Sequence, residues 1–259
     1  MKYGFIGCGN MGGALARALT QTTKDLIISD PSPAAQRFAE ELGCAYGTNE
    51  QVVQCDRIFL AVKPNIVESV LTALAPALTQ RKPLLISMAA GVKIEKLQGW
   101  AGTDLPIIRI MPNTPAAVGK GMITYDTNAQ VTPELLADFL QDMAMAGTFD
   151  ALPEKLMDVA TAVAGCGPAY MYMMIEAMAD GAVVCGLPRD KAMRYAAATM
   201  AGAAEMVLRT GQHPGALKDA VCSPGGSTIA GVQTLEQHGF RGTVIDCVTD
   251  AYRRTQELG

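Results

Sequence analysis

A glycine-rich segment near the start of the chain has residue types and spacing suited to binding a pyrophosphate. Residues 7–12 read Gly-Cys-Gly-Asn-Met-Gly, which matches the pattern G-x-G-x-x-G. The first glycine permits a tight turn, the second lets the backbone approach the phosphates, and the third lets a helix pack closely on a strand. Backbone N–H groups at the start of that helix would hold the pyrophosphate. We therefore predict a dinucleotide site at Gly7, Cys8, Gly9, Asn10, Met11 and Gly12.

An acidic residue follows this loop at the distance expected for a ribose ligand. Asp30 lies 18 positions after Gly12, at the end of a second apolar segment, where a carboxylate binds ribose hydroxyls. A carboxylate there repels the 2′-phosphate of NADP, so Asp30 favours NADH. Ser29 or Ser32 could still contact a phosphate, which leaves NADPH open. Asp30 could also be an ordinary turn residue before Pro31.

Three further segments, at 61–64, 89–91 and 111–115, follow apolar runs that are typical of buried strands. Ligands of parallel sheets bind beyond the carboxyl ends of the strands, where small residues allow close approach of the backbone. Lys63 and Asn113 could form hydrogen bonds there, although each segment could equally be plain turn chemistry. Beyond the glycine loop, the predicted cofactor-binding residues are Ser29, Asp30, Asn49, Ala61, Val62, Lys63, Pro64, Ala89, Ala90, Gly91 and Asn113.

A second loop, late in the chain, has the composition of a carboxylate receptor. Residues 222–228 read Cys-Ser-Pro-Gly-Gly-Ser-Thr, in which Pro-Gly-Gly forces a turn and the hydroxyl residues can cap a helix. Successive backbone N–H groups at such a helix start bind carboxylates. On local grounds an ordinary capped loop is the alternative.

The elements that position these loops differ between the two halves of the chain. In the first half, apolar strand-like segments at 3–6, 26–29, 58–62, 84–88, 107–110 and 121–125 alternate with helices near 14–19, 34–42 and 66–75. This alternation predicts an α/β Rossmann domain, a doubly wound parallel sheet with helices on both faces, over residues 1–150.

The second half, 151–259, has no convincing strand and predicts an all-α domain. Helices are expected near 155–163, 169–185, 189–210, 214–221, 228–238 and 243–257. The segment 170–175 is apolar all round, and 195–204 carries no charge. A small helical domain has difficulty hiding such surfaces, which favours a subunit interface over a simple core.

Composition excludes several classes of protein. The chain has 259 residues, 49% of them apolar, and a formal net charge of −4 without a Lys/Arg cluster, which argues against nucleic-acid binding. Seven irregularly spaced cysteines without a CxxC indicate reduced thiols and a cytoplasmic protein. Two histidines are too few for a typical imidazole metal site, so no metal is predicted. The longest uncharged run, 17 residues broken by glycine and proline, is short for a membrane span.

Taken together, the ordered motifs resemble the pyrroline-5-carboxylate reductase family over essentially the whole chain. Ser-Pro-Gly-Gly-x-Thr-Ile after Leu-Lys-Asp is the most specific of them. The matching segments are Gly7–Gly12, Ala61–Pro64, Ala89–Val92, Met111–Pro115, Gly165–Tyr170, Gly186–Arg189 and Ser223–Ile229.

The resemblance implies an all-α C-terminal dimerisation domain and reduction of 1-pyrroline-5-carboxylate to L-proline with NAD(P)H. It implies a homodimer through the C-terminal helices, of a kind that often assembles into larger rings such as a decamer. The substrate, a small imine carboxylate, would bind at the late loop, contributed across the dimer, with Thr228 hydrogen-bonded to the ring nitrogen. The implied substrate-binding residues are Ser223, Gly225, Gly226, Ser227 and Thr228.

Four positions depart from the family pattern. Asp30 stands where NADPH-preferring members usually have Ser, Asn or a nearby Arg, which puts that preference in doubt here. Ala220 replaces a frequent Asn, so one cofactor contact is in question. Cys166 replaces a usual serine, and Gly211 stands where some relatives carry an acidic residue.

Two alternatives come from other classes of protein. A β-hydroxyacid dehydrogenase shares the plan of a Rossmann domain followed by helices, but it needs a lysine on the first long helix of the second domain. Residues 156–187 contain no lysine, which argues against that chemistry. A non-catalytic NAD-binding protein is the second alternative, and the intact late loop argues against it.

Overall fold

The computed structural model describes residues 2–258, and its contacts divide the chain into two compact units. Of the described residues, the first comprises 2–166 and 251–258, and the second 167–250. The strands all belong to the first unit: β1 (Tyr3–Ile6), β2 (Leu26–Ser29), β3 (Ala45–Tyr46), β4 (Arg57–Leu60), β5 (Leu84–Ser87), β6 (Ile107–Met111), β7 (Gly121–Thr127) and β8 (Gly147–Ala151).

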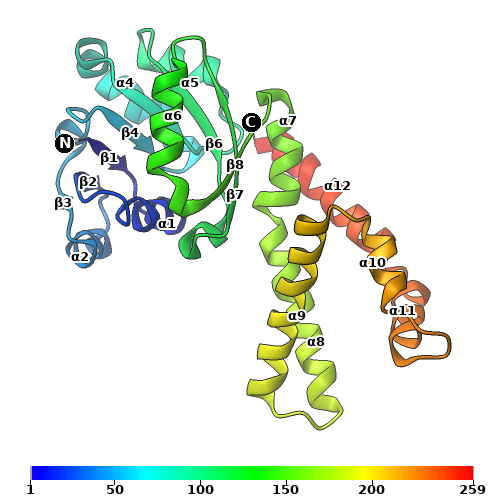
Figure 1. Cartoon of the computed structure of the whole chain (residues 1–259). Coiled ribbons are helices and arrows are strands. Elements are labelled where there is room, and N and C mark those ends of the chain that lie inside the picture. Colours follow the sequence, from blue (N-terminus) through cyan, green and yellow to red (C-terminus); the bar gives the residue numbers. More distant parts are fainter. Residues whose placement is uncertain (1, 259) are drawn as a thin grey trace. The chain divides into compact units, whose positions relative to one another are not determined.

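Helices alternate with these strands, and after β8 every element is a helix (Figure 1). Those of the first part are α1 (Asn10–Leu19), α2 (Pro33–Leu42), α3 (Asn49–Val52), α4 (Pro64–Arg81), α5 (Ile94–Ala101), η1 (Thr114–Val118), α6 (Pro133–Asp142), η2 (Ala144–Ala146), α7 (Glu154–Ala160) and the π-helical turn η3 (Thr161–Gly165). Those that follow are α8 (Gly167–Val184), α9 (Arg189–Thr210), α10 (Pro214–Ala220), α11 (Ser227–Gln237) and α12 (Phe240–Leu258).

The sheet has the strand order β3-β2-β1-β4-β5-β6-β7-β8, and parallel pairing runs from β3 through to β6. The central strands β1, β4, β5 and β6 are buried along their whole length, because helices cover both faces. Two hydrophobic clusters fill the two faces, one containing Phe5 and Phe59 stacked 4.4 Å apart, the other containing Ile58 and Leu85. This arrangement confirms the predicted Rossmann-type α/β domain and brings the carboxyl ends of β1, β2, β4, β5 and β6 to one edge.

Local sequence explains where the helices begin and end. The Ser32 side chain accepts a hydrogen bond from the N–H of Ala34, Pro33 occupies the first turn, and Gly43 ends α2 with φ +69°. Thr132 caps α6 in the same way before Pro133. Both starts place a proline where its missing N–H is not needed.

Several elements differ from the sequence-based expectation. Strand β7 runs antiparallel to β6, so the sheet is mostly parallel rather than wholly parallel. Strand β4 ends at Leu60, two residues before the predicted end, and a π-helical turn follows α7 where one continuous helix was expected. The helices α3, α5 and α6 and the short strands β3 and β8 were not predicted. By contacts the first unit extends to Cys166, beyond the predicted boundary at residue 150, and includes α7.

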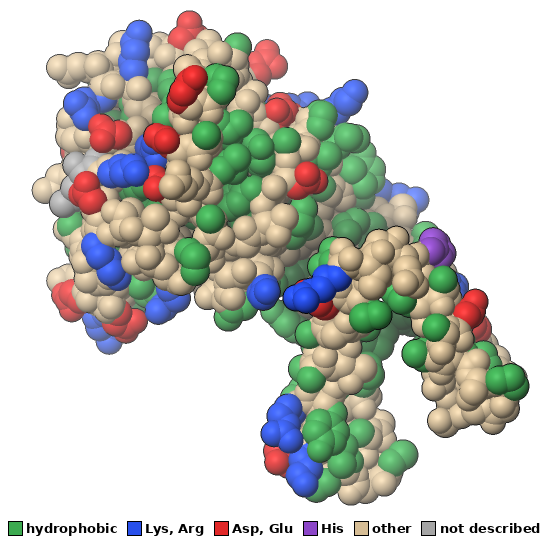
Figure 2. Space-filling model, in the orientation of Figure 1, with side chains coloured by type: hydrophobic (Ala, Val, Ile, Leu, Met, Phe, Trp, Pro, Cys, Tyr) green, Lys and Arg blue, Asp and Glu red, His purple; other side chains and the backbone are tan. Residues whose placement is uncertain are grey.

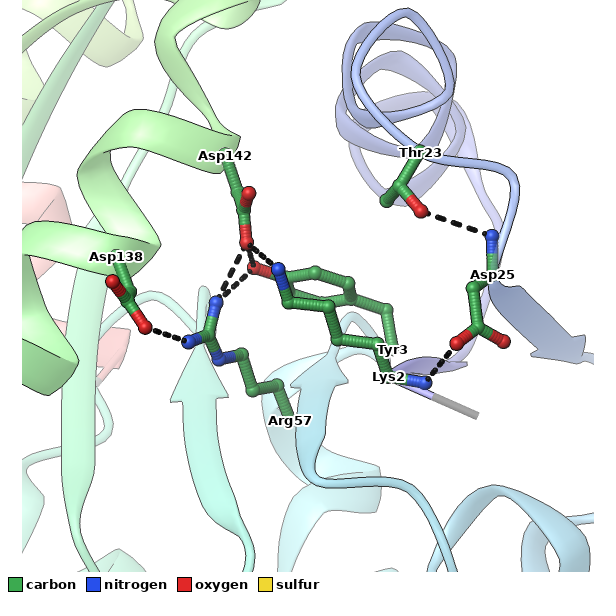
Figure 3. A network of polar contacts seen from close by, with 7 residues as sticks. All are labelled: Lys2, Tyr3, Thr23, Asp25, Arg57, Asp138 and Asp142. Carbon is green, nitrogen blue, oxygen red and sulfur yellow. Dashed lines mark hydrogen bonds and ion pairs between the residues drawn. The ribbon is translucent and has the colours of Figure 1, made fainter.

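A polar network closes the opposite end of the sheet, at the amino ends of β1 and β4 (Figure 3). Arg57 is buried, and its guanidinium donates to Tyr3 Oη at 2.6 Å, Asp142 Oδ2 at 2.7 Å and Asp138 Oδ2 at 3.0 Å. Tyr3 Oη donates to Asp142 at 2.6 Å, and Lys2 Nζ lies 2.6 Å from the same carboxylate. The network joins the end of α6 to the two central strands.

The second unit has little core of its own. Helices α8 and α9 lie side by side, and the buried hydrophobic residues among 167–250 are three alanines, Ala179, Ala192 and Ala196. Met173 is 70% exposed and Leu208 80% exposed. Hydrophobic side chains are visible on the surface of this helix pair in Figure 2. The predicted helical second half is confirmed, and no helix in the described part of the chain is long and apolar enough to cross a membrane.

Candidate active site

The glycine loop between β1 and α1 is shaped by contacts that tolerate no side chain at two of its glycines. Gly7 has φ +91°, and a Cβ there would lie 2.6 Å from the carbonyl oxygen of Ala61. A Cβ at Gly12 would lie 2.9 Å from both the Ala61 Cβ and the Gly7 oxygen. At Gly9 no atom outside the adjoining residues lies within 4 Å of the Cβ position. The loop therefore packs tightly on the protein side and is open at Gly9, which fits a pyrophosphate beside the backbone.

Asp30 lies at the end of β2 and is bonded to this loop. Its Oδ2 accepts a hydrogen bond from the N–H of Cys8 at 2.6 Å, and its Oδ1 accepts from the N–H of Ser32 at 2.8 Å. Its backbone oxygen accepts from the Tyr46 hydroxyl at 2.6 Å. The residue is therefore both a brace of the glycine loop and an anion at the predicted ribose position. Each carboxylate oxygen keeps a second lone pair for a ribose hydroxyl.

The Cys8 side chain lies half-buried inside the same loop. Burial, and then the nearby Asp30 carboxylate, raise the pKa of the Cys8 thiol to about 12. The thiol therefore stays protonated at neutral pH and is not a nucleophile.

A hollow beside the loop carries two arginines that sequence reasoning did not place together. Arg17 on α1 lies with its guanidinium 5.1 Å from the Phe38 ring centroid and 4.0 Å from Glu41. Arg37 on α2 lines the same hollow, together with Ser32. The hollow thus brings together a hydroxyl, two cationic groups and the Glu41 carboxylate beside the glycine loop. The sequence contained only a weak signal, because the two arginines lie 20 positions apart on different helices.

The other predicted cofactor residues lie at neighbouring strand ends. The Ser29 hydroxyl donates to Asn49 Oδ1 at 2.7 Å, which joins the end of β2 to α3. Ala61 follows β4, and its N–H donates to the Ile6 oxygen at 2.8 Å. Further along the same edge, Val62, Lys63 and Pro64 lead into the start of α4. Ala89, Ala90 and Gly91 form the turn after β5.

Asn113 follows β6, but its side chain is engaged inside the protein. Its Nδ2 donates to the Ala164 oxygen at 2.9 Å, and its Oδ1 accepts from the N–H of Met122 at 3.0 Å. It stands at the N-cap position of η1 without capping that turn. The residue thus lies where the sequence predicted, with partners that the sequence did not indicate.

The late loop belongs to the second unit. Gly226 N–H donates to the Ser223 oxygen at 3.0 Å, and Gly225 has φ +67°, so residues 223–226 form the expected tight turn. Gly226 caps α11, in which Ser227 and Thr228 occupy the first two positions. Their N–H groups have no carbonyl to bond within the helix. Ser227 and Thr228 are exposed, so these groups are accessible to a carboxylate.

One buried charge near this edge was not predicted from the sequence. Arg109 on β6 is buried, pairs with Glu154 at 2.9 Å, and lies 3.6 Å from Asp158, both on α7. An arginine inside the apolar run Ile-Ile-Arg-Ile was the available signal, because a buried guanidinium needs a partner. Among residues 2–258 no group of three His, Cys, Asp or Glu side chains could hold a metal ion.

The two halves of the chain match two family models. Residues 2–91 match the model described as NADP oxidoreductase coenzyme F420-dependent, and residues 154–258 match Pyrroline-5-carboxylate reductase dimerisation. A pyrroline-5-carboxylate reductase from Escherichia coli (strain K12) is 43% identical, with 99% of this chain and 98% of the relative covered. The chain belongs to the pyrroline-5-carboxylate reductase family.

Relatives of this family span distant organisms. The pyrroline-5-carboxylate reductase of Pisum sativum is 41% identical over 98% of this chain and 95% of its own length. A Plasmodium falciparum pyrroline carboxylate reductase, solved with NADP bound, superposes with a TM-score of 0.90 at 36% identity, covering 100% of this chain and 98% of the other. The family assignment confirms the resemblance read from the motifs and identifies the protein as an NAD(P)-dependent oxidoreductase.

Proposed function

We propose that this chain reduces the C=N bond of 1-pyrroline-5-carboxylate to give L-proline, with the glycine loop holding the dinucleotide and the loop at 223–228 holding the substrate. The observation that carries the proposal is the open backbone at Gly9 between two closely packed glycines. Membership of the reductase family supplies the substrate class. The nicotinamide, when bound, supplies a hydride to the imine carbon.

The residues of the chain have to orient the imine and neutralise its carboxylate. The N–H groups of Ser227 and Thr228 and the positive end of α11 would hold that carboxylate. Gly226 shapes the turn but its own N–H is already bonded to Ser223, so it does not serve the substrate. The Thr228 hydroxyl would accept a hydrogen bond from the protonated ring nitrogen. An iminium accepts hydride better than a neutral imine, so orientation is the main requirement.

Initial rates of dinucleotide oxidation test this function directly. The purified protein should consume NADH or NADPH when 1-pyrroline-5-carboxylate is added and should form proline in equal amount. Folded protein that binds dinucleotide but shows no turnover would refute the proposal and favour a non-catalytic binding protein.

Replacing Thr228 by alanine should lower kcat about 10-fold, because one hydrogen bond to the reacting ring is lost. Steady-state rates at saturating dinucleotide measure the effect. Thr234→Ala is a matched control, since Thr234 lies on the same helix and its hydroxyl donates only to the Ala230 oxygen. An unchanged kcat and KM in Thr228→Ala would remove this hydroxyl from the mechanism.

The cofactor preference depends on Asp30. Its negative charge beside the glycine loop supports a preference for NADH over NADPH. Asp30→Ser should therefore improve the NADPH/NADH ratio of kcat/KM by about 10-fold, the effect of one charge repulsion of about 1.4 kcal/mol. An unchanged NADPH/NADH ratio would mean that Asp30 only braces the glycine loop. The 2′-phosphate would then be assigned to the hollow lined by Arg17, Arg37 and Ser32.

A homodimer through the helical unit, in the cytoplasm, completes the proposal. The exposed apolar side chains of α8 and α9 and the small alanine core support burial against a second copy. The match of residues 154–258 to a dimerisation model supports the same partner. Five such dimers would form a decameric ring. Seven free cysteines fit a reducing compartment.

Sedimentation equilibrium should give at least twice the chain mass of 27.3 kDa. Met173→Glu should shift the mass toward the monomer, because a charge on a buried interface is poorly solvated. Met145→Glu is the control, since Met145 is also an exposed methionine but lies in η2 of the first unit. A monomeric wild-type protein would contradict the proposal.

A further inference from the structure

The backbone at the end of the first unit has a carbonyl whose usual partner is missing. In an α-helix the oxygen of residue i accepts from the N–H of residue i+4. For Ala164, in the π-helical turn η3, that residue is Pro168, which has no N–H. The N–H of Cys166 bonds five residues back, to Thr161, at 2.9 Å. The Ala164 carbonyl thus lacks an α-helical donor, and it accepts a hydrogen bond from a side chain outside its helix.

Asn113 supplies the donor. Its Nδ2 lies 2.9 Å from the Ala164 oxygen, while its Oδ1 accepts from the N–H of Met122 at 3.0 Å. Because Met122 N–H can only donate and the Ala164 oxygen can only accept, the orientation of the carboxamide is fixed from both ends. The side chain is 7% exposed. One amide therefore fastens the end of β6, the start of β7 and the turn η3 to one another.

An ion pair on β6, four residues before Asn113, holds helix α7. Arg109 pairs with Glu154 at 2.9 Å, and Glu154 also accepts from the N–H of Ile94 at 2.8 Å. The N–H of Glu154 donates to Asp126 on β7 at 2.6 Å. Helix α7 is therefore fixed at its start by Glu154, and the turn after it is fixed by Asn113. The chain enters the second unit at Gly167, three residues beyond Ala164.

We infer that Asn113 is a positioning residue that fixes the turn from which the chain leaves the first unit, and that it acts on imine reduction through that turn instead of binding the dinucleotide. This inference rests on the proposed function, because the substrate loop belongs to the unit that begins there. It replaces the sequence-based expectation of a cofactor ligand. Loss of the Asn113 donor should therefore change use of the imine more than affinity for the dinucleotide.

Asn113→Asp tests the inference with little change in shape, since the acceptor for Met122 is kept and the donor to Ala164 is lost. We expect KM for the imine to rise about 10-fold, the effect of one lost buried hydrogen bond. The Kd for NADH and NADPH, measured by fluorescence titration, should stay within about 2-fold. If the Kd instead rises as much as KM, Asn113 contacts the dinucleotide and the inference is wrong.

A double-mutant cycle with Pro168 isolates the bond to Ala164. Pro168→Ala returns an N–H to position 168, so the Ala164 oxygen regains a helical donor. The rise in KM caused by Asn113→Ala should then be about 3-fold smaller in the Pro168→Ala background. Purely additive effects would show that Asn113 does not act through Ala164.

Hydrogen exchange separates failure of this inference from failure of the proposed function. Backbone amides of residues 161–167 should exchange faster in Asn113→Asp whether or not the imine is the substrate. Unchanged exchange would overturn the positioning role. Absence of imine reduction by the wild-type protein would refute the proposed function alone.

Discussion

The Gly7→Ala variant is expected to lose dinucleotide binding together with part of its thermal stability. At φ +91° an alanine is strained by about 1–3 kcal/mol. Its Cβ would also stand 2.6 Å from the Ala61 oxygen, so either the glycine loop or the segment after β4 must move. Since both belong to the proposed cofactor edge, we expect the Kd for dinucleotide to rise at least about 100-fold. Fluorescence titration measures the Kd, and calorimetry should show a Tm lower by about 5 °C.

Gly9→Ala separates binding from folding at the same loop. Its Cβ meets no protein atom within 4 Å, so Tm should stay at the wild-type value while the methyl group obstructs the pyrophosphate. Gly99→Ala is a remote control, because Gly99 also has an open Cβ position but lies in α5. If Gly9→Ala binds dinucleotide as tightly as Gly99→Ala, the pyrophosphate does not approach this loop.

Removal of the Asp142 carboxylate is expected to have the largest effect on stability. The carboxylate receives hydrogen bonds from Arg57 and Tyr3 and pairs with Lys2, so Asp142→Ala leaves a buried guanidinium without its principal partner (Figure 3). Breaking such a pair lowers the free energy of unfolding by about 3 kcal/mol. For a chain of this size that corresponds to a fall in Tm of about 10 °C. Calorimetry at neutral pH measures it.

Asp138→Ala is the matched control in the same network. Asp138 also contacts Arg57, at 3.0 Å, but its side chain is 65% exposed against 14% for Asp142. Its loss should lower stability by about 1 kcal/mol or less. Equal effects of the two variants would show that burial does not decide the strength of the network.

The effect of Asp142 also has a defined pH dependence. Burial alone raises the pKa of this carboxyl, but hydrogen bonds from Lys2 and Tyr3 outweigh burial and hold the pKa below its ordinary value. A carboxyl with a lowered folded-state pKa contributes stability above its ordinary pKa and loses it as pH falls through the folded-state value. The difference between wild type and Asp142→Ala should therefore shrink in acid.

Local signals in the sequence were enough to predict the Rossmann-type domain. The glycine loop was predictable because Gly7 and Gly12 are needed for backbone reasons that any Rossmann turn shares. Helix α6 was missed although Thr132-Pro133 is a regular helix start. The direction of β7 was not predictable, since an antiparallel neighbour requires only a different connection and not a different strand composition.

The hydrogen-bond and ion-pair partners of individual side chains could not be predicted from the sequence. Asn113 was correctly placed after a strand, but its bond to Ala164 spans 51 positions and depends on a proline in another element. Arg109 stands inside an apolar run and Arg57 directly before one, which indicated a need for partners without identifying them. The residues that provide them, Asp142 and Glu154, come from segments that fold back on the sheet only in three dimensions.

The protonated state of Cys8 has a consequence for oxidative chemistry. Peroxides and alkylating reagents react with thiolates, and a thiol with a pKa of about 12 presents almost none at neutral pH. The Cys8 sulfur in the glycine loop is therefore resistant to modification, whereas Cys185 is exposed to solvent. Burial protects the thiol in this way, and the Asp30 carboxylate that braces the loop adds to that protection.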